Sequence, residues 1–251
     1  MIGSDPSAPG WRGSHHPTPA APVVEALRDL ARSLQGIDWY LCGGQAAVVH
    51  GRTVPADEVE VRVACTTGGA MDLVHTLERG GLQPRIPDIE DFISRGRRRP
   101  WARCSLPLRH AATGIAVDVV LSASPGRGGP AQDSAARLEK LFFDHAEPTD
   151  LGGVVVKVIS PAHLVVTKVL VGEPEDVEDA AAVLRAAGGR GGLGGAAAGG
   201  SAGSRGIAAQ VRDTLGLYAG LVDVDALLDT FAEVLARARP SSPGGRSSRK
   251  R

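Results

Sequence analysis

Apolar side chains recur at helical spacing in several parts of the chain. Residues 22–35 place Val and Leu side chains on one face and Glu25, Arg28 and Arg32 on the other, which predicts an amphipathic helix. The same kind of spacing predicts further helices over residues 45–50, 69–79, 134–143, 162–171, 174–187, 207–219 and 224–238.

Strand patterns alternate with these helices. Residues 58–64 alternate strictly, with valines on one side and Glu58, Glu60 and Arg62 on the other, as in a half-buried strand. Short and mainly apolar runs predict further strands over residues 38–42, 101–108, 115–121 and 154–159. Together these elements predict an α/β (α+β) fold.

Segments rich in Gly, Pro and Ser divide the chain. Residues 1–21 and the basic residues 239–251 should be disordered tails, and residues 188–206 should form a Gly-rich linker. The rest of the chain then forms a core over residues 22–160 and a helical region over residues 161–238.

Composition and charge exclude few functions. The 251 residues suit one or two domains, and a hydrophobic content of 43% is ordinary for a globular protein. Lys and Arg total 28, as do Asp and Glu, so the overall charge does not argue for nucleic acid, a membrane or an acidic partner. The chain lacks both a long apolar run and a secretory signal pattern, so we expect a cytoplasmic protein with no membrane partner.

The cysteines and the paired histidines do not indicate a metal site. Cys42, Cys65 and Cys104 are isolated, odd in number and set in apolar runs, which favours buried reduced thiols over a disulfide. The His15-His16 pair lies in the N-terminal tail with no third ligand nearby.

The candidate chemistry lies around a glycine pair. Gly43 and Gly44 stand between a predicted strand and a predicted helix, where backbone amides can approach phosphate oxygens without a Cβ in the way. Glu58 and Glu60 follow on the next strand, and their i, i+2 spacing points both carboxylates to one face. Such a pair can bind one Mg²⁺ or two ions close together, which neutralise a triphosphate and orient an attacking hydroxyl.

A third acid, Asp118, lies within the apolar run IAVDVVL. An unpaired charge in such surroundings is costly, so we expect a metal or a basic partner there. Arg103 and Arg109 are alternative partners. Glu58 and Glu60 have a simpler interpretation too, as the solvent face of an amphipathic strand.

Two basic features also allow two interpretations. Lys168 lies on an otherwise apolar helix, where it could extend its ammonium to solvent or reach a phosphate. Residues 95–99 form a basic run, predicted to be a loop, that could be solvated or could contact RNA or a triphosphate.

These residues carry a resemblance to a known superfamily. The stretch CGGQAAVVHGRTVPADEVEV resembles the nucleotidyltransferase pattern of Gly-Gly or Gly-Ser followed, nine to thirteen residues later, by acid-x-acid between apolar positions. IAVDVVL resembles the strand with the third carboxylate. SPAHLVVTKVLVGEPEDVEDAAAVL resembles the helical segment of AbiEii-like, toxin-type nucleotidyltransferases. The resemblance covers about residues 23–187.

The resemblance implies a fold and a role for each position. The fold would be a nucleotidyltransferase-like mixed sheet flanked by helices, with a C-terminal helical region. Asp176 or Asp179 would order the helical side of the cleft. The metal ligands would be Glu58, Glu60 and Asp118; the phosphate-binding residues would be Gly43, Gly44 and Lys168; and the catalytic set would be Glu58, Glu60, Asp118 and Lys168.

The resemblance also implies an activity. A Mg²⁺-dependent enzyme would transfer a nucleotide from a nucleoside triphosphate to a hydroxyl on RNA or tRNA, a protein or a small molecule. A toxin-like role with an antitoxin partner would follow by analogy.

Three departures support alternatives from other classes. Glu58 stands where the family usually has Asp, Ala56 replaces a small hydroxyl residue, and Glu173 and Glu175 replace basic residues. The domain could therefore be a catalytically inactive binding or regulatory module. A third possibility is an interaction protein whose helices in residues 207–238 dock a partner.

Overall fold

The computed structural model describes residues 19–65, 68–97, 105–121, 138–191, 206–218 and 222–239. Several predicted features lie wholly or largely outside these residues. They are both predicted tails, His15, His16, Cys104, Arg103, residues 98–99 and most of the Gly-rich linker.

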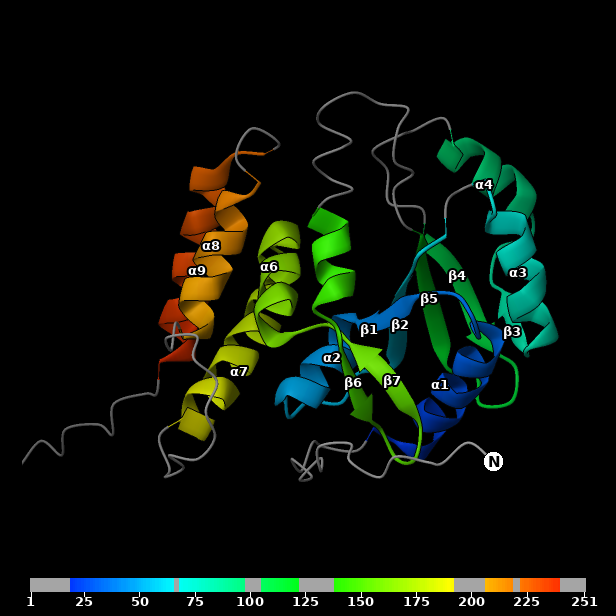
Figure 1. The fold of residues 1–251 in the computed structure, drawn as a ribbon, viewed down its shortest axis with the longest axis horizontal. Coiled ribbons are helices and arrows are strands. Elements are labelled where there is room, and N and C mark those ends of the chain that lie inside the picture. The colour runs from blue at the N-terminus through cyan, green and yellow to red at the C-terminus, as the bar shows by residue number, and fades with distance from the viewer. Residues whose placement is uncertain are drawn as a thin grey trace, which may run out of the picture.

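A mixed sheet of seven strands forms the centre of the protein (Figure 1). The strand order is β3-β4-β5-β2-β1-β7-β6, and the pairs β2–β5 and β1–β7 are parallel while the other pairs are antiparallel. The strands are β1 (Trp39–Cys42), β2 (Glu58–Val63), β3 (Leu82–Pro84), β4 (Ser105–His110), β5 (Ala116–Leu121), β6 (Glu147–Asp150) and β7 (Val155–Val158).

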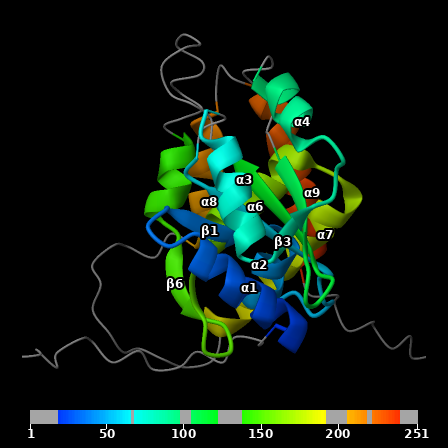
Figure 2. The same ribbon diagram turned by 90° about the vertical axis from the view of Figure 1, so that its right-hand side faces the viewer.

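Helices flank this sheet, which confirms the predicted fold class. In Figure 1, α1, α3 and α4 lie on one side and the C-terminal helices on the other, with α2 between the latter and the sheet. Figure 2 shows the same arrangement from the side of α1 and α3. The helices are α1 (Ala21–Ser33), α2 (Gly43–His50), α3 (Ala70–Arg79), α4 (Ile89–Arg97), α6 (Pro161–Val171), α7 (Pro174–Gly191), α8 (Ile207–Gly216) and α9 (Val224–Ala238), and residues 138–144 are helical too.

The alternation in β2 produces two different faces of the sheet. Val59, Val61 and Val63 are fully buried, and they belong to the same core as the leucines of α1 and α3. Burial of this apolar surface is the main favourable contribution to folding here. The opposite face of β2 carries Glu58, Glu60 and Arg62, so the candidate acids lie on the face away from α1.

An ion pair lies on this second face, at the end of β2 that is farther from Glu58. Arg62 Nη1 donates to Glu139 Oε1 at 2.9 Å, and both side chains are largely buried. Burial alone would lower the pKa of Arg62, but the neighbouring Tyr40 and Glu139 outweigh it and raise the pKa. Tyr40 packs edge-on against Phe143, with 4.8 Å between ring centroids. The helical residues 138–144 therefore cover this end of the sheet, and the acids lie at the open end.

Several element boundaries differ from the sequence-based predictions. Strands β3 and β6 are too short and too polar to stand out as apolar runs, and helix α4 carries Arg95–Arg97, which we predicted to be a loop. Helix α2 begins at Gly43 itself, because the helix starts within the glycine pair. Helix α7 continues to Gly191, so residues 188–191 of the predicted linker are helical. Within the described residues, no helix has the length and apolar character needed to cross a membrane.

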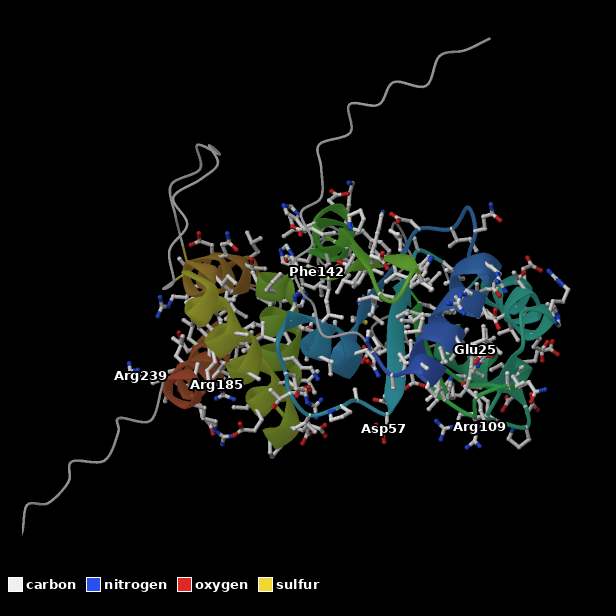
Figure 3. The ribbon with its side chains drawn as sticks, turned by 90° about the horizontal axis from the view of Figure 1, so that it is seen from below. Glu25, Asp57, Arg109, Phe142, Arg185 and Arg239 are labelled. Atoms are coloured by element: carbon white, nitrogen blue, oxygen red, sulfur yellow. The ribbon has the colours of Figure 1, made fainter. Side chains whose placement is uncertain are left out.

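The buried face of α1 provides a test of this packing. Leu27 is fully buried, so Leu27→Ala should lower the free energy of unfolding by about 2–5 kcal/mol. The matched control is Glu25→Ala on the exposed face of the same helix (Figure 3), which should change it by less than about 0.5 kcal/mol. Urea unfolding measures both, and equal effects would contradict the observed orientation of α1.

Candidate functional site

The glycine turn and the acidic strand are in direct contact. Gly43 has a φ of +63°, and a Cβ at this position would lie 2.5 Å from Glu60 Oε2 and 2.8 Å from Glu60 Cβ. Only glycine therefore fits between β1 and the Glu60 side chain. Cys42 also donates from Sγ to Glu60 Oε1 at 3.4 Å. The start of α2 thus packs against the second acid of the acid-x-acid strand.

The sheet register brings the third acid beside the second. Glu60 lies opposite Asp118 in the parallel pair β2–β5, and Glu58 lies opposite Ala116 on the same face. Side chains of register partners project to one face of a sheet, so the three predicted metal ligands share a face. Glu58 is exposed, while Glu60 and Asp118 are half-buried.

The charges of these acids oppose one another. Burial raises the pKa of Asp118, the charge of Glu60 raises it further, and the charge of Arg85 opposes the shift. Burial and the charges of Asp118 and Glu60 likewise raise the pKa of Glu58. Among the described residues, neither Glu58 nor Asp118 forms an ion pair, so the predicted alternative pairing of Asp118 with Arg109 is wrong.

A group of paired charges faces the acids. Arg52 donates from Nη1 to Asp179 Oδ2 at 3.2 Å and from Nη2 to Glu175 Oε1 at 3.1 Å. Lys168 donates to Asp176 at 2.6 Å and to Asp179 at 2.9 Å. Burial would lower the pKa of Lys168, but its hydrogen bonds to the two aspartates raise it, so this amine stays protonated at neutral pH. Asp179, which is 2% exposed, therefore fixes both cations.

A cleft of about 380 Å³ lies between the acids and this charged group. One of its lining residues, Asp57, is exposed, and Figure 3 shows it at the edge of the molecule, away from Phe142. Six carboxylates and two cations contribute to its walls, so the described lining is strongly acidic. The lining residues are Gly44, Arg52, Pro55, Ala56, Asp57, Glu58, Glu60, Lys168, Glu175, Asp176 and Asp179.

The donor set suits a divalent cation in its chemistry. Half-buried carboxylates that repel one another gain most from a cation, and Mg²⁺ prefers oxygen ligands. In the described part of the chain, however, no group of three or more His, Cys, Asp or Glu side chains is placed to hold a metal ion. Mg²⁺ in nucleotide sites usually takes one or two carboxylates together with substrate phosphates, so two of these acids would suffice.

The structure places most of the predicted site residues around one cleft. Gly44, Glu58, Glu60 and Lys168 line it, and Asp118 lies beside Glu60 but outside the lining. Their roles in metal binding, phosphate binding and catalysis stay predictions. Of the cysteines, Cys42 is buried and Cys65 is only half-buried, and neither forms a disulfide among the described residues.

Sequence reasoning missed Arg52. It lies in the loop between α2 and β2, where a basic residue carries no periodic signal. Arg52 lies in the sequence between the glycine pair and the acid pair. Because both pairs were predicted to form the site, a residue of the loop that joins them could have been expected to lie near it.

Comparison with known proteins adds little. No protein-family model matches the sequence, and no curated protein does. The fold is similar to the crystal structure of an antigenic nucleotidyltransferase-like protein from Paracoccidioides brasiliensis, with 14% sequence identity and a TM-score of 0.41 over 83% of this chain and 92% of that one.

The contact between Gly43 and Glu60 can be tested with a matched pair of glycines. Gly43→Ala adds a Cβ that collides with Glu60, so it should destabilise the protein by about 2–4 kcal/mol. Gly114 also has a positive φ, +74°, but an added Cβ there would meet nothing within 4 Å, so Gly114→Ala should cost only about 1–2 kcal/mol of backbone strain. Urea unfolding compares them; equal losses would show that Glu60 does not press on the turn.

The repulsion among the acids gives a pH-dependent prediction. Because the native pKa of Asp118 lies above the ordinary 3.8, the native state binds the proton more tightly than the unfolded chain. Stability therefore falls as the pH rises from 3.8 through the native pKa, and the full penalty is present at neutral pH. Asp118→Asn should raise the melting temperature at pH 7, and this gain should shrink as the pH falls through the native pKa and vanish only below 3.8.

The matched control is Asp229→Asn, which removes an exposed acid of α9 far along the chain from the site. It should change the free energy of unfolding by less than about 0.5 kcal/mol over this pH range. A loss of stability in Asp118→Asn at pH 7 would mean that this carboxylate has a favourable partner in the folded protein.

Proposed function

We propose that this protein is a Mg²⁺-dependent nucleotidyltransferase that moves a nucleotide from a nucleoside triphosphate to a hydroxyl acceptor. The observation that carries the proposal is the placement of Glu58, Glu60 and Asp118 on one face of the sheet, beside a glycine turn that only glycine can form. Sequence spacing places Glu58 and Glu60 on one face but cannot place Asp118 beside them, and the strand register does so.

The acids would hold the metal. Glu60 is fixed by the turn and by Cys42, Glu58 is free to adjust from its exposed position, and Asp118 lies beside Glu60 on the neighbouring strand. A bound Mg²⁺ would neutralise the triphosphate and lower the pKa of an attacking hydroxyl. Asp118, on the same face of the sheet as the other two acids, would accept the proton of that hydroxyl.

The phosphates would bind on the other side of the cleft. The N-terminus of α2 at Gly43 and Gly44 provides partial positive charge, and Lys168 and Arg52 provide full positive charges. Asp179 holds both cations in place, which limits the entropy lost when a ligand binds them. Because the described lining is acidic overall, a metal-bound nucleotide fits the cleft better than a free one.

The acceptor and the biological role extend this proposal. RNA or tRNA, a protein and a small molecule are the candidate acceptors, in the cytoplasm. A toxin-like role with an antitoxin partner of the AbiEii-like kind rests on the sequence resemblance alone.

A catalytically inactive binding or regulatory module of the same fold is the second candidate. It is favoured by the longer Glu side chains on β2 and by the carboxylates that already neutralise both cations of the cleft. Such a module would keep the fold and the cleft without the transfer reaction.

Transfer of labelled nucleotide tests the first candidate. Purified protein with each radiolabelled nucleoside triphosphate, Mg²⁺, and RNA, protein or small-molecule acceptors should give labelled product that EDTA abolishes. Glu58→Gln and Asp118→Asn should lower the rate at least about a hundredfold, since each removes a metal ligand or base. Glu147→Gln, at the edge strand β6, is the matched control and should leave the rate unchanged.

Nucleotide-dependent thermal stabilisation separates the two candidates. Stabilisation by a nucleoside triphosphate with Mg²⁺ but no transfer would favour the inactive module. Transfer that survives both acid substitutions would show that the active site lies elsewhere.

A further inference from the structure

The two cations of the cleft are neutralised by three carboxylates of one helix. Asp176, Asp179 and Glu175 of α7 bind Lys168 and Arg52. These carboxylates differ in exposure: the side chain of Asp179 is 2% exposed and that of Asp176 14%, but that of Glu175 is 75% exposed. Glu175 is therefore the carboxylate that can leave its cation without opening the structure.

The geometry at Arg52 separates a fixed side from an exchangeable side. Nε and Nη1 bind the two oxygens of buried Asp179 at 3.0 and 3.2 Å, and Nη2 binds only Glu175, at 3.1 Å, among the contacts of the described residues. A guanidinium that a buried carboxylate holds through Nη1 still has its Nη2 hydrogens for a second oxyanion, and phosphate accepts them as well as carboxylate does.

We propose that Glu175 occupies the position of a substrate phosphate on Arg52 Nη2 and thereby limits the affinity of the cleft for anionic ligands. The inference rests on the proposed function, because it concerns the phosphate-binding side of the same cleft. An exposed ion pair contributes little free energy, so an incoming phosphate can displace Glu175. The displaced carboxylate would still lie close to the bound anion and repel it.

The position of Glu175 at the cleft supports this role. Glu175 lines the cleft together with Glu58 and Arg52. The charge of Glu175 also raises the pKa of Glu58, after burial and the larger effects of other acids, so its carboxylate acts across the cleft.

Another glutamate of α7 provides a matched control. Glu178 is also exposed and also pairs with an arginine, Arg237 of α9 at 2.7 Å, but it does not line the cleft. Glu175→Gln and Glu178→Gln therefore remove the same charge from the same helix, one inside the cleft and one outside it.

Binding of inorganic tripolyphosphate with Mg²⁺, measured by calorimetry on the full chain, tests the proposal. Glu175→Gln should bind about three- to tenfold more tightly than the unchanged protein, and Glu178→Gln should bind equally well. The gain should shrink at 0.5 M salt, because the repulsion that it removes is screened. In Arg52→Gln the further change Glu175→Gln should give a smaller gain, because only the repulsion is then removed and no cation is released. The comparison of Glu175→Gln with Glu178→Gln tests the proposal even if the Arg52→Gln variant does not fold.

The outcomes separate the two proposals. If the unchanged protein binds tripolyphosphate and Glu175→Gln binds it equally or more weakly, Glu175 does not compete for the phosphate position and this inference fails alone. An equal gain in Glu178→Gln would also overturn it, since the effect would then be one of net charge. If neither the protein nor any variant binds tripolyphosphate or a nucleoside triphosphate, the proposed function fails with it.

Discussion

The parallel pairing of β2 with β5 is the constraint on which the candidate site depends. Its register places Glu60 beside Asp118 on one face, and on the other it buries the valines of both strands in the core. A slip of one residue would exchange the two faces and expose those valines to water. The core therefore fixes the register, and the register holds like charges together at a cost that a cation would offset.

The cleft combines two opposite electrostatic arrangements. On the sheet, Glu58 and Asp118 lack ion-pair partners among the described residues, and their pKa values are raised. Across the cleft, Arg52 and Lys168 have more carboxylate partners than they need. The acids on the sheet therefore suit a bound cation. The two cations across the cleft already have carboxylate partners, so one of these must be displaced before an anion can bind.

The sequence indicated the main features of the site because each left a local signal. Strict alternation predicted β2, an apolar run with one acid predicted β5, and the glycine pair marked the turn. It could not show which strands pair, because register depends on contacts far apart in the sequence. Arg52 escaped for the same reason: a loop arginine looks like an ordinary surface residue until the fold brings it within 3.1 Å of Glu175.

The charged wall of the cleft has a consequence for how the chain can be divided. Lys168 and Asp179 belong to α6 and α7, while the glycine turn and the acids belong to the sheet. The boundary at residue 160, drawn from the sequence, therefore runs through the site. A fragment that ends at residue 160 would retain the acids but would leave Arg52 without both of its carboxylate partners. The core and the helical region should therefore be kept together in recombination and in protein engineering.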